Sequence, residues 1–329
     1  MPFITVVIPA YNHERFIGDA LESVLFQTIQ DWELIVVDDG STDATALVVQ
    51  QYRDSRFRLL RQTNSGAPSA LNRGINEAKG KWIAFLNSDD RFHANKLERH
   101  LQAHQSNPNI EASASRVRYI DASGIPKNSY SYYTLRYRSM IRKASYAHSL
   151  FASLVLENHL ITTSCLFAKR DALLEVGGFA DFRYVHDWFM FLSLASRGKF
   201  VVIEEELSDY RRHAGNTIKE DDITGQIEDN LALAWQISTY LEQNPADEEV
   251  GVVFSNLSRN IRVDFELLSL LALWRLHNGG QALSSKGIIQ AQSEWFRRHC
   301  YQIVQRKRMR GSFRRLLQNV ALLKEIWRK

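Results

Sequence analysis

The stretch that decides the fold is Lys81-Trp82-Ile83-Ala84-Phe85-Leu86-Asn87-Ser88-Asp89-Asp90, where a short apolar run ends in an amide, a hydroxyl and two carboxylates. An uncharged run of this length is typical of a strand buried on both faces. Carboxylates fixed just beyond such a strand suit a hard divalent cation, Mg²⁺ or Mn²⁺. For Asp89 and Asp90 taken alone, the alternative is a solvated turn or a helix cap before Ala94.

Outward from this stretch, apolar strands alternate with helical patterns. We predict strands at 3–9, 32–37, 57–61 and 81–86, and helices at 13–27, 43–52, 68–78 and 95–104, the second of them capped by Ser41 or Asp43. This alternation predicts parallel βαβ units. The expected fold class is therefore α/β, a Rossmann-like, mostly parallel sheet flanked by helices.

The second half of the sequence is less regular. Strand-like segments occur at 112–120, 163–168 and 200–203, and a helix is expected to begin near His186. Beyond about residue 220 only helical periodicity is found, mainly at 223–241, 252–276 and 290–327. We therefore expect a catalytic domain at 1–217 and a helical C-terminal region at 218–329.

The loops after the first, second and fourth predicted strands are polar. Ligands of open α/β sheets bind outside the carboxyl ends of the strands, so these loops form the expected binding edge. They contain Ala10-Tyr11-Asn12, Asp38-Asp39-Gly40-Ser41 and Asn87-Ser88-Asp89-Asp90. One carboxylate of the second loop would accept hydrogen bonds from a base or ribose, although Asp-Gly is also common turn chemistry.

The overall composition is that of a folded protein. The 329 residues are 45% hydrophobic and 24% charged, with a net charge of +4. Cys165 and Cys300 lie far apart without a metal-site spacing, and we expect free thiols in a reducing compartment, with a disulfide as the open alternative. With no basic leader before the first strand and no apolar run of about 18 residues, we expect a cytoplasmic location.

The C-terminal segment 296–329 differs in charge from the rest. It contains eleven Lys or Arg residues and one acidic residue, Glu325. Its apolar residues recur at helical spacing and predict a basic amphipathic helix, suited to an anionic membrane surface and to a peripheral position on the inner face of a membrane. The alternative is a helix packed on the catalytic domain. No recognised motif indicates nucleic-acid binding.

Several motifs together resemble one known family. They are Val6-Val7-Ile8-Pro9-Ala10-Tyr11-Asn12, Trp32 to Asp43, Asn64-Ser65-Gly66, Leu71-Asn72-Arg73-Gly74-Ile75 and Ala78 to Asp90, followed by the weaker Val176-Gly177-Gly178-Phe179, His186-Asp187-Trp188 and Tyr210-Arg211-Arg212-His213. In order and spacing they resemble the inverting family 2 glycosyltransferases of GT-A fold. The resemblance covers about residues 3–215.

The resemblance implies a role for each matched residue. Asp89 falls on the metal-binding position of the family's DxD motif, His213 lies where some members place a further metal or diphosphate contact, and Asp90 is counted with these two as a metal ligand. Asp187 matches the catalytic base. The positions implied for binding the nucleotide-sugar are Pro9, Ala10, Tyr11, Asn12, Asp39, Arg73, Asn87 and Ser88.

Three departures from the family pattern matter. Asn87 replaces the first DxD carboxylate, which would weaken metal affinity. His186 stands where Glu is common, and a cationic imidazole there would lower the pKa of Asp187. Leu71 stands where Arg is frequent, so neutralisation of the diphosphate would depend more on the metal and on Arg73 or His213.

The resulting prediction is an inverting transfer of sugar from a nucleotide-sugar, most simply a UDP-sugar, to a hydroxyl of a saccharide or lipid-linked acceptor in polysaccharide or glycolipid assembly. One alternative is a catalytically impaired nucleotide-sugar- or carbohydrate-binding protein, which Asn87 favours and the three retained aspartates disfavour. A nucleotidyltransferase would need a glycine-rich phosphate loop where Tyr11-Asn12-His13-Glu14 stands. The sugar, the acceptor and the oligomeric state are not predicted.

Overall fold

The computed structural model describes residues 2–128, 131–145, 147 and 149–216, together with 232, 233, 236, 239, 240 and 244. Nearly all of the predicted C-terminal helical region, the basic segment 296–329 and Cys300 lie outside these residues. Within the described chain, Cys165 is a buried free thiol. None of the helices in this part of the chain combines the length and the apolar character that crossing a membrane requires.

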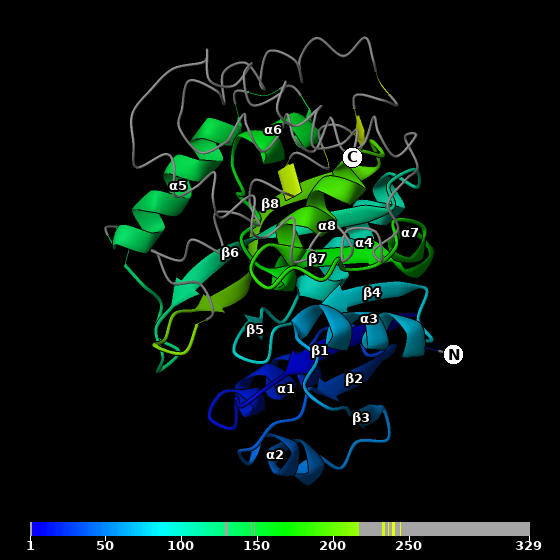
Figure 1. Ribbon diagram of the computed structural model, residues 1–329, viewed down its shortest axis with the longest axis vertical. Helices are drawn as coiled ribbons and strands as arrows, with labels where there is room; N and C mark the ends of the chain where they lie inside the picture. The colour runs from blue at the N-terminus through cyan, green and yellow to red at the C-terminus, as the bar shows by residue number, and fades with distance from the viewer. Residues whose placement is uncertain are drawn as a thin grey trace, which may run out of the picture.

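The centre of the molecule is one eight-stranded sheet in the order β3-β2-β1-β4-β7-β6-β8-β5 (Figure 1). The strands are β1 (Ile4–Ala10), β2 (Trp32–Asp38), β3 (Phe57–Arg61), β4 (Trp82–Phe85), β5 (Arg91–Phe92), β6 (Ala112–Ile120), β7 (Leu166–Lys169) and β8 (Phe200–Arg211). Strands β3, β2, β1 and β4 are parallel, and so are β6 and β8. Antiparallel pairing occurs where β7 meets β4 and β6 and where β5 meets β8. The predicted α/β class is confirmed.

Helices cover both faces of this sheet. They are α1 (Ile17–Leu25), α2 (Thr45–Gln51), α3 (Ala67–Glu77), α4 (Lys96–Ser106), α5 (Tyr132–Ala144), α6 (Leu150–Leu156), α7 (Arg170–Glu175) and α8 (His186–Ala195), with a 3₁₀ turn at Thr163–Cys165. Side chains of α1, α2 and α4 share one apolar core, and those of α3, α6, α7 and α8 share the other. Successive residues of β1 point into different cores, Val6 toward α1 and Val7 toward α3. Burial on both faces explains why the strand has no polar alternation.

The structure corrects several details of the sequence prediction. Helix α1 begins at Ile17 rather than at residue 13, because residues 12–14 form a loop bonded to residues 41–45. Strand β8 extends to Arg211, well past the predicted end at residue 203. Helices α5, α6 and α7 and strand β5 were not predicted. The N-cap of α2 is Ala44 rather than Ser41 or Asp43, although Asp43, the residue before it, accepts a hydrogen bond from the Thr45 N–H at 2.9 Å.

Candidate active site

The ends of β1, β2 and β4 lie side by side and carry polar loops, as the sequence predicted (Figure 1). Tyr11 follows β1, and its side chain is 46% exposed. Asp39 follows β2, and its N–H donates to the Ala10 carbonyl at 2.8 Å. Pro9 and Ala10 belong to β1 itself. They shape this edge through the backbone.

The loop after β1 is held to the loop after β2 by side-chain hydrogen bonds. Asn12 has φ of 53°, a left-handed conformation that asparagine tolerates better than most residues. Its Oδ1 accepts from the Thr42 N–H at 2.8 Å, and its own N–H donates to Ser41 Oγ at 3.0 Å. Asn12 therefore fixes the loop that carries Tyr11 next to the loop after β2, which contains Asp39.

Asp39 is buried and accepts three hydrogen bonds from the segment after β3. Its Oδ1 accepts from Gln62 Nε2 at 2.8 Å and from the Ser65 N–H at 2.9 Å, and its Oδ2 accepts from the Gly66 N–H at 2.8 Å. Gly66 has φ of 88°, which favours glycine. The carboxylate thus fixes the turn that starts α3.

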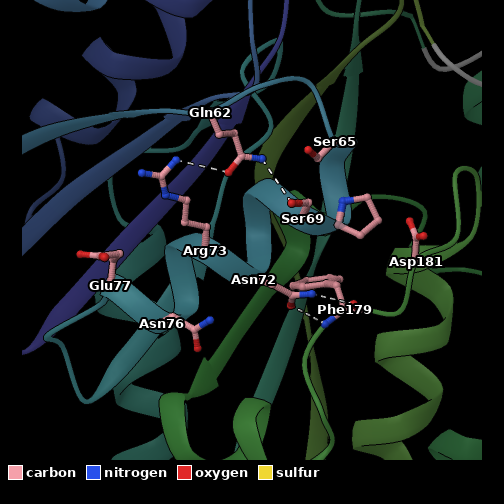
Figure 2. A pocket seen from close by; sticks show the side chains of 10 residues that line it. Gln62, Ser65, Ser69, Asn72, Arg73, Asn76, Glu77, Phe179 and Asp181 are labelled. Atoms are coloured by element: carbon pink, nitrogen blue, oxygen red, sulfur yellow. Dashed lines mark hydrogen bonds between the residues drawn. The ribbon is translucent and has the colours of Figure 1, made fainter. Parts of the chain in front are cut away.

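A pocket of about 630 Å³ runs along α3 from this turn (Figure 2). Gln62 links it to Asp39, because its Nε2 also approaches Ser69 Oγ at 3.3 Å. Arg73 lines the pocket and donates to the Arg61 carbonyl at 2.7 Å. Its guanidinium therefore lies with the α3 pocket, and none of the residues that line this pocket is Asp89 or His213.

Asn87 is turned toward the 3₁₀ segment. Its Nδ2 donates to Thr162 Oγ1 at 3.0 Å, and its N–H donates to Ser164 Oγ at 2.9 Å. The Asn87 amide thus donates a hydrogen bond to a threonine oxygen, which an ionised carboxylate cannot do because it only accepts.

Asp90 has a different environment from Asp89, although the two are adjacent. Its side chain is fully buried; Oδ2 accepts from Ser164 Oγ at 2.6 Å and Thr162 Oγ1 at 3.2 Å, and Oδ1 accepts from the Arg211 N–H at 3.0 Å. Burial, followed by repulsion from Asp89, raises the pKa of Asp90 well above its ordinary value. These contacts turn Asp90 into the protein interior, so the expectation that it binds metal receives no support from the geometry.

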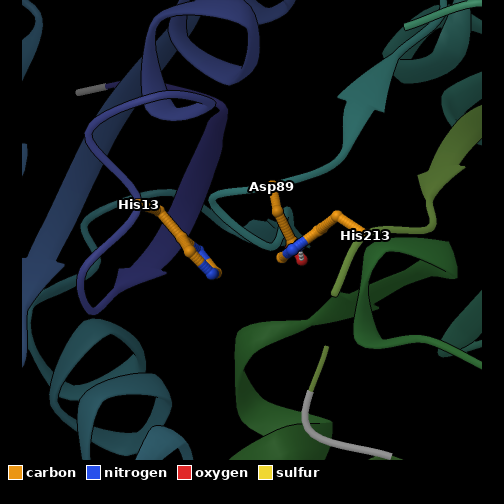
Figure 3. A group of neighbouring side chains, drawn as sticks. All are labelled: His13, Asp89 and His213. Atoms are coloured by element: carbon orange, nitrogen blue, oxygen red, sulfur yellow. Dashed lines mark hydrogen bonds and ion pairs between the residues drawn. The ribbon is translucent and has the colours of Figure 1, made fainter. Parts of the chain in front are cut away.

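Asp89 meets two histidines from distant parts of the sequence (Figure 3). Its Oδ2 lies 2.9 Å from His213 Nε2, and His13 completes a group whose ligand atoms all lie within 4.8 Å of one another. His13 Nδ1 in turn lies 2.7 Å from Ser88 Oγ. Burial lowers the pKa of His13, which favours a neutral ring. The structure thus brings together Asp89 and His213, which the sequence analysis named, and His13, which it did not.

Arg211 organises the backbone beneath this group. The guanidinium is 1% exposed and donates to the Asp89 carbonyl at 2.7 Å, to Asp19 Oδ2 at 2.6 Å and to the Ala122 carbonyl at 3.1 Å. The same residue stands two positions before His213. Arg211 therefore ties the loop that carries Asp89 to the strand that delivers His213.

Asp187 lies in the first turn of α8 and is buried. Burial raises the pKa of its carboxyl; His186 acts in the opposite direction but does not outweigh burial. The predicted effect of His186 on the pKa of Asp187 thus has the right direction, but the larger effect of burial was not predicted. Burial raises the pKa of the Cys165 thiol to about 12, and the carboxyls of Asp90 and Asp187 act in the same direction.

Sequence reasoning missed three residues of this region. His13 lies in a loop motif that was quoted, but nothing in the spacing links it to Asp89. Arg211 was quoted within Tyr210-Arg211-Arg212-His213, and its burial could not be read from an alternating strand pattern. Gln62 follows a predicted strand, which was the one available signal.

The chain is similar to several known glycosyltransferases and to solved structures. The Escherichia coli UDP-Glc:alpha-D-GlcNAc-diphosphoundecaprenol beta-1,3-glucosyltransferase WfgD is 45% identical over 96 residues, 29% of this chain and 38% of that protein. S. aureus TarS 1–349 in complex with UDP-GlcNAc has a TM-score of 0.57 at 18% identity, over 71% of this chain and 66% of that chain. Mannosyltransferase PcManGT from Pyrobaculum calidifontis, in complex with GDP-Man and Mn²⁺, has a TM-score of 0.53 at 16% identity, over 90% of this chain and 82% of that chain.

The structural likenesses confirm the GT-A fold. The chain spans 29% to 66% of the length of several curated relatives that it matches. The model of the family described as Glycosyl transferase family 2 matches residues 5–177, more than half of the chain. This chain is accordingly a member of glycosyl transferase family 2.

Proposed function

We propose that this protein is an inverting glycosyltransferase that uses a nucleotide-sugar donor, most simply a UDP-sugar. The observation that carries the proposal is the convergence of Tyr11, Asp39 and Asp89 at the ends of three adjacent parallel strands. This is the edge at which open α/β sheets bind nucleotides. Relatives support the nucleotide, since UDP-glucose is named in the E. coli protein and UDP-GlcNAc is bound to TarS.

In this proposal the nucleoside lies against the loops after β1 and β2. The exposed ring of Tyr11 offers a face on which a base can stack. The Asp39 carboxylate holds the Ser65–Gly66 turn and has acceptor capacity beyond its three hydrogen bonds, because two carboxylate oxygens offer about four lone-pair sites. Asp39 would thus both shape the nucleoside site and accept a hydrogen bond from the base or ribose.

Asp89 and His213 would hold a divalent cation next to the donor's diphosphate. A carboxylate oxygen and an imidazole nitrogen 2.9 Å apart fit neighbouring positions around one metal ion. The ion would supply electrostatic stabilisation of the charge that grows on the departing diphosphate. The Mn²⁺ in the mannosyltransferase complex makes manganese a reasonable first choice.

Asp187 would act as the general base. Its position in the first turn of α8 gives it a fixed orientation, and its raised pKa makes it a stronger proton acceptor than an ordinary aspartate once it is ionised. It would take the proton of an acceptor hydroxyl while that oxygen attacks the anomeric carbon on the face opposite the nucleotide. A saccharide or lipid-linked acceptor is proposed, the latter because the E. coli relative is named for a diphosphoundecaprenol acceptor.

The test is calorimetry of UDP-, GDP- and dTDP-sugars with and without Mn²⁺. We expect one nucleotide class to bind with metal, and Asp39→Ala to weaken that binding. If none of the donors binds in the presence of Mn²⁺, the proposed use of a nucleotide-sugar donor is refuted.

A further inference from the structure

The group around Asp89 contains a histidine that the sequence pattern did not assign. We propose that His13 is the third protein ligand of the metal, and that the site is a two-histidine, one-carboxylate site that prefers Mn²⁺ to Mg²⁺. This inference rests on the proposed metal at Asp89 and His213. It adds His13 as a third ligand and a preference of the site for Mn²⁺ over Mg²⁺.

The geometry of the three side chains fits one ion. They come from the loops after β1, β4 and β8, and their ligand atoms lie within 4.8 Å of one another. Atoms that share a first-row cation lie about 3–4.4 Å apart, because each bond is about 2.0–2.2 Å long. The side chain of His13 points toward Asp89 and His213 in Figure 3. The three ligand atoms are therefore close enough together to contact one ion.

Ser88 determines which nitrogen of His13 is available. Its buried Oγ lies 2.7 Å from Nδ1 and can accept a hydrogen bond from a protonated Nδ1; in that tautomer the Nε2 lone pair is left for the metal. A ligating histidine usually donates its other ring N–H to an oxygen in this way. The backbone of His13 is also fixed, since its N–H donates to Thr45 Oγ1 at 2.8 Å. Ser88 is thus a positioning residue for His13.

The same loop explains why a nitrogen ligand is needed. Asn87 replaces a carboxylate and is committed to Thr162, and the Asp90 carboxyl is committed to Ser164 and to the Arg211 N–H. Asp89 is therefore the one carboxylate of the loop directed at the group. Imidazole nitrogens bind first-row transition-metal ions better than they bind Mg²⁺, which prefers oxygen ligands, so two imidazoles beside one carboxylate favour Mn²⁺ over Mg²⁺.

The experiment measures Mn²⁺ binding to the full chain by electron paramagnetic resonance, with and without UDP. We expect electron spin-echo modulation from two imidazole nitrogens in the wild type and from one in His13→Gln. The Mn²⁺ dissociation constant should rise at least about tenfold in His13→Gln and about tenfold in Ser88→Ala, in the range known for losing a supporting partner of a ligand. His13→Asp should narrow the preference for Mn²⁺ over Mg²⁺.

His93→Gln serves as the matched control, because His93 contacts Asp209 rather than Asp89. It should leave the modulation and the Mn²⁺ affinity unchanged, and circular dichroism should confirm that all variants are folded. If His13→Gln and Ser88→Ala bind Mn²⁺ like the wild type with the same nitrogen modulation, His13 is not a ligand, while the proposed enzyme stands. If the wild type binds UDP-sugars but no Mn²⁺ under either condition, the metal site itself is refuted.

Discussion

Replacing Arg211 by methionine should destabilise the protein by about 3 kcal/mol. The guanidinium donates to the buried Asp89 carbonyl, to the Ala122 carbonyl and to Asp19. An unsatisfied buried carbonyl costs about 1–3 kcal/mol. The ion pair with Asp19, whose side chain is 45% exposed, contributes about 0.5–1 kcal/mol, and the Ala122 carbonyl is rehydrated because Ala122 is exposed.

A second contribution comes from the ring beneath the guanidinium. Arg211 lies 5.1 Å from the Phe16 ring centroid, a cation–π contact of about 0.5–1 kcal/mol. Methionine restores some apolar packing but none of these polar contacts. Lysine at 211 keeps the charge but lacks the planar fork that serves three acceptors at once, so Arg211→Lys should lose about half as much.

Urea unfolding followed by tryptophan fluorescence measures the loss. The control is Arg99→Met, an arginine that pairs with Glu205 on the surface and should leave the unfolding midpoint unchanged. Mn²⁺ affinity should fall in Arg211→Met, because the backbone of Asp89 loses its support. A stability loss below about 1 kcal/mol would show that Arg211 does not stabilise the fold as argued, and an unchanged Mn²⁺ affinity would show that it does not position the Asp89 loop.

Three further predictions concern the base, a close backbone contact and a buried lysine. Asp187→Asn should abolish transfer in a radiolabelled-sugar assay, while calorimetry should still detect donor binding. The turnover of the wild type should also fall with decreasing pH at a higher pH than an ordinary aspartate base would give. The reason is that burial raises the pKa of this carboxyl, whose ionised form is needed. Gly80→Ala should lower the thermal midpoint of unfolding far more than Gly198→Ala. An added Cβ at Gly80 would lie 2.5 Å from the Thr5 backbone nitrogen. At Gly198 there is open space, and alanine there would be strained only by the backbone φ of 68°. Burial lowers the pKa of Lys96 to about 7, so between about pH 7 and 10 the unfolded chain binds more protons than the folded chain. The free energy of unfolding, measured by urea titration, should therefore rise with pH across that window. The rise should be smaller in Lys96→Met.

The parallel half of the fold was predictable because its strands are buried on both faces. The predicted strands at 3–9, 32–37 and 57–61 agree with β1, β2 and β3 to within a residue at each end. Strand β8 was underestimated because the charged residues 204–206 interrupt its apolar pattern while the ladder with β6 continues. The strands that are buried on both faces were therefore predicted well, whereas intrinsic strand propensity did not reveal the full length of β8.

Helix α5 shows the limit of periodicity in another way. Of its side chains, Tyr137 is buried while Leu135 and Tyr132 are exposed, so no clear apolar stripe marks the helix. Its Ser131 cap, which accepts from the Thr134 N–H, is a local signal that the apolar pattern did not reveal. The helix forms because α6 and β6 offer it a packing surface, and such contacts are not encoded locally.

In the site, sequence reasoning could name positions but could not separate neighbours. Asp89 and Asp90 are identical residues at consecutive positions, yet one faces His213 and the other accepts from Ser164 inside the protein. The direction of each side chain depends on how the loop leaves β4. The contact between Asp89 and His213 spans 124 positions and arises because β8 returns to pair with β5, directly after the Asp89–Asp90 loop.

The different environments of Asn87, Asp89 and Asp90 affect the charge of the proposed metal site. Burial favours the protonated form of Asp90 and Asn87 is neutral, so the proposed metal would have Asp89 as its single carboxylate among the described side chains. A divalent cation with one carboxylate and two neutral imidazoles keeps a net positive charge of about one. That charge faces the place where the donor's diphosphate would lie and is best balanced by it. Metal and donor should therefore strengthen each other's binding by the same factor, since coupling between two ligands is reciprocal. With a neutral Asn87 in place of a second carboxylate, the proposed cation would be held less tightly by the protein alone and more tightly once the donor is bound.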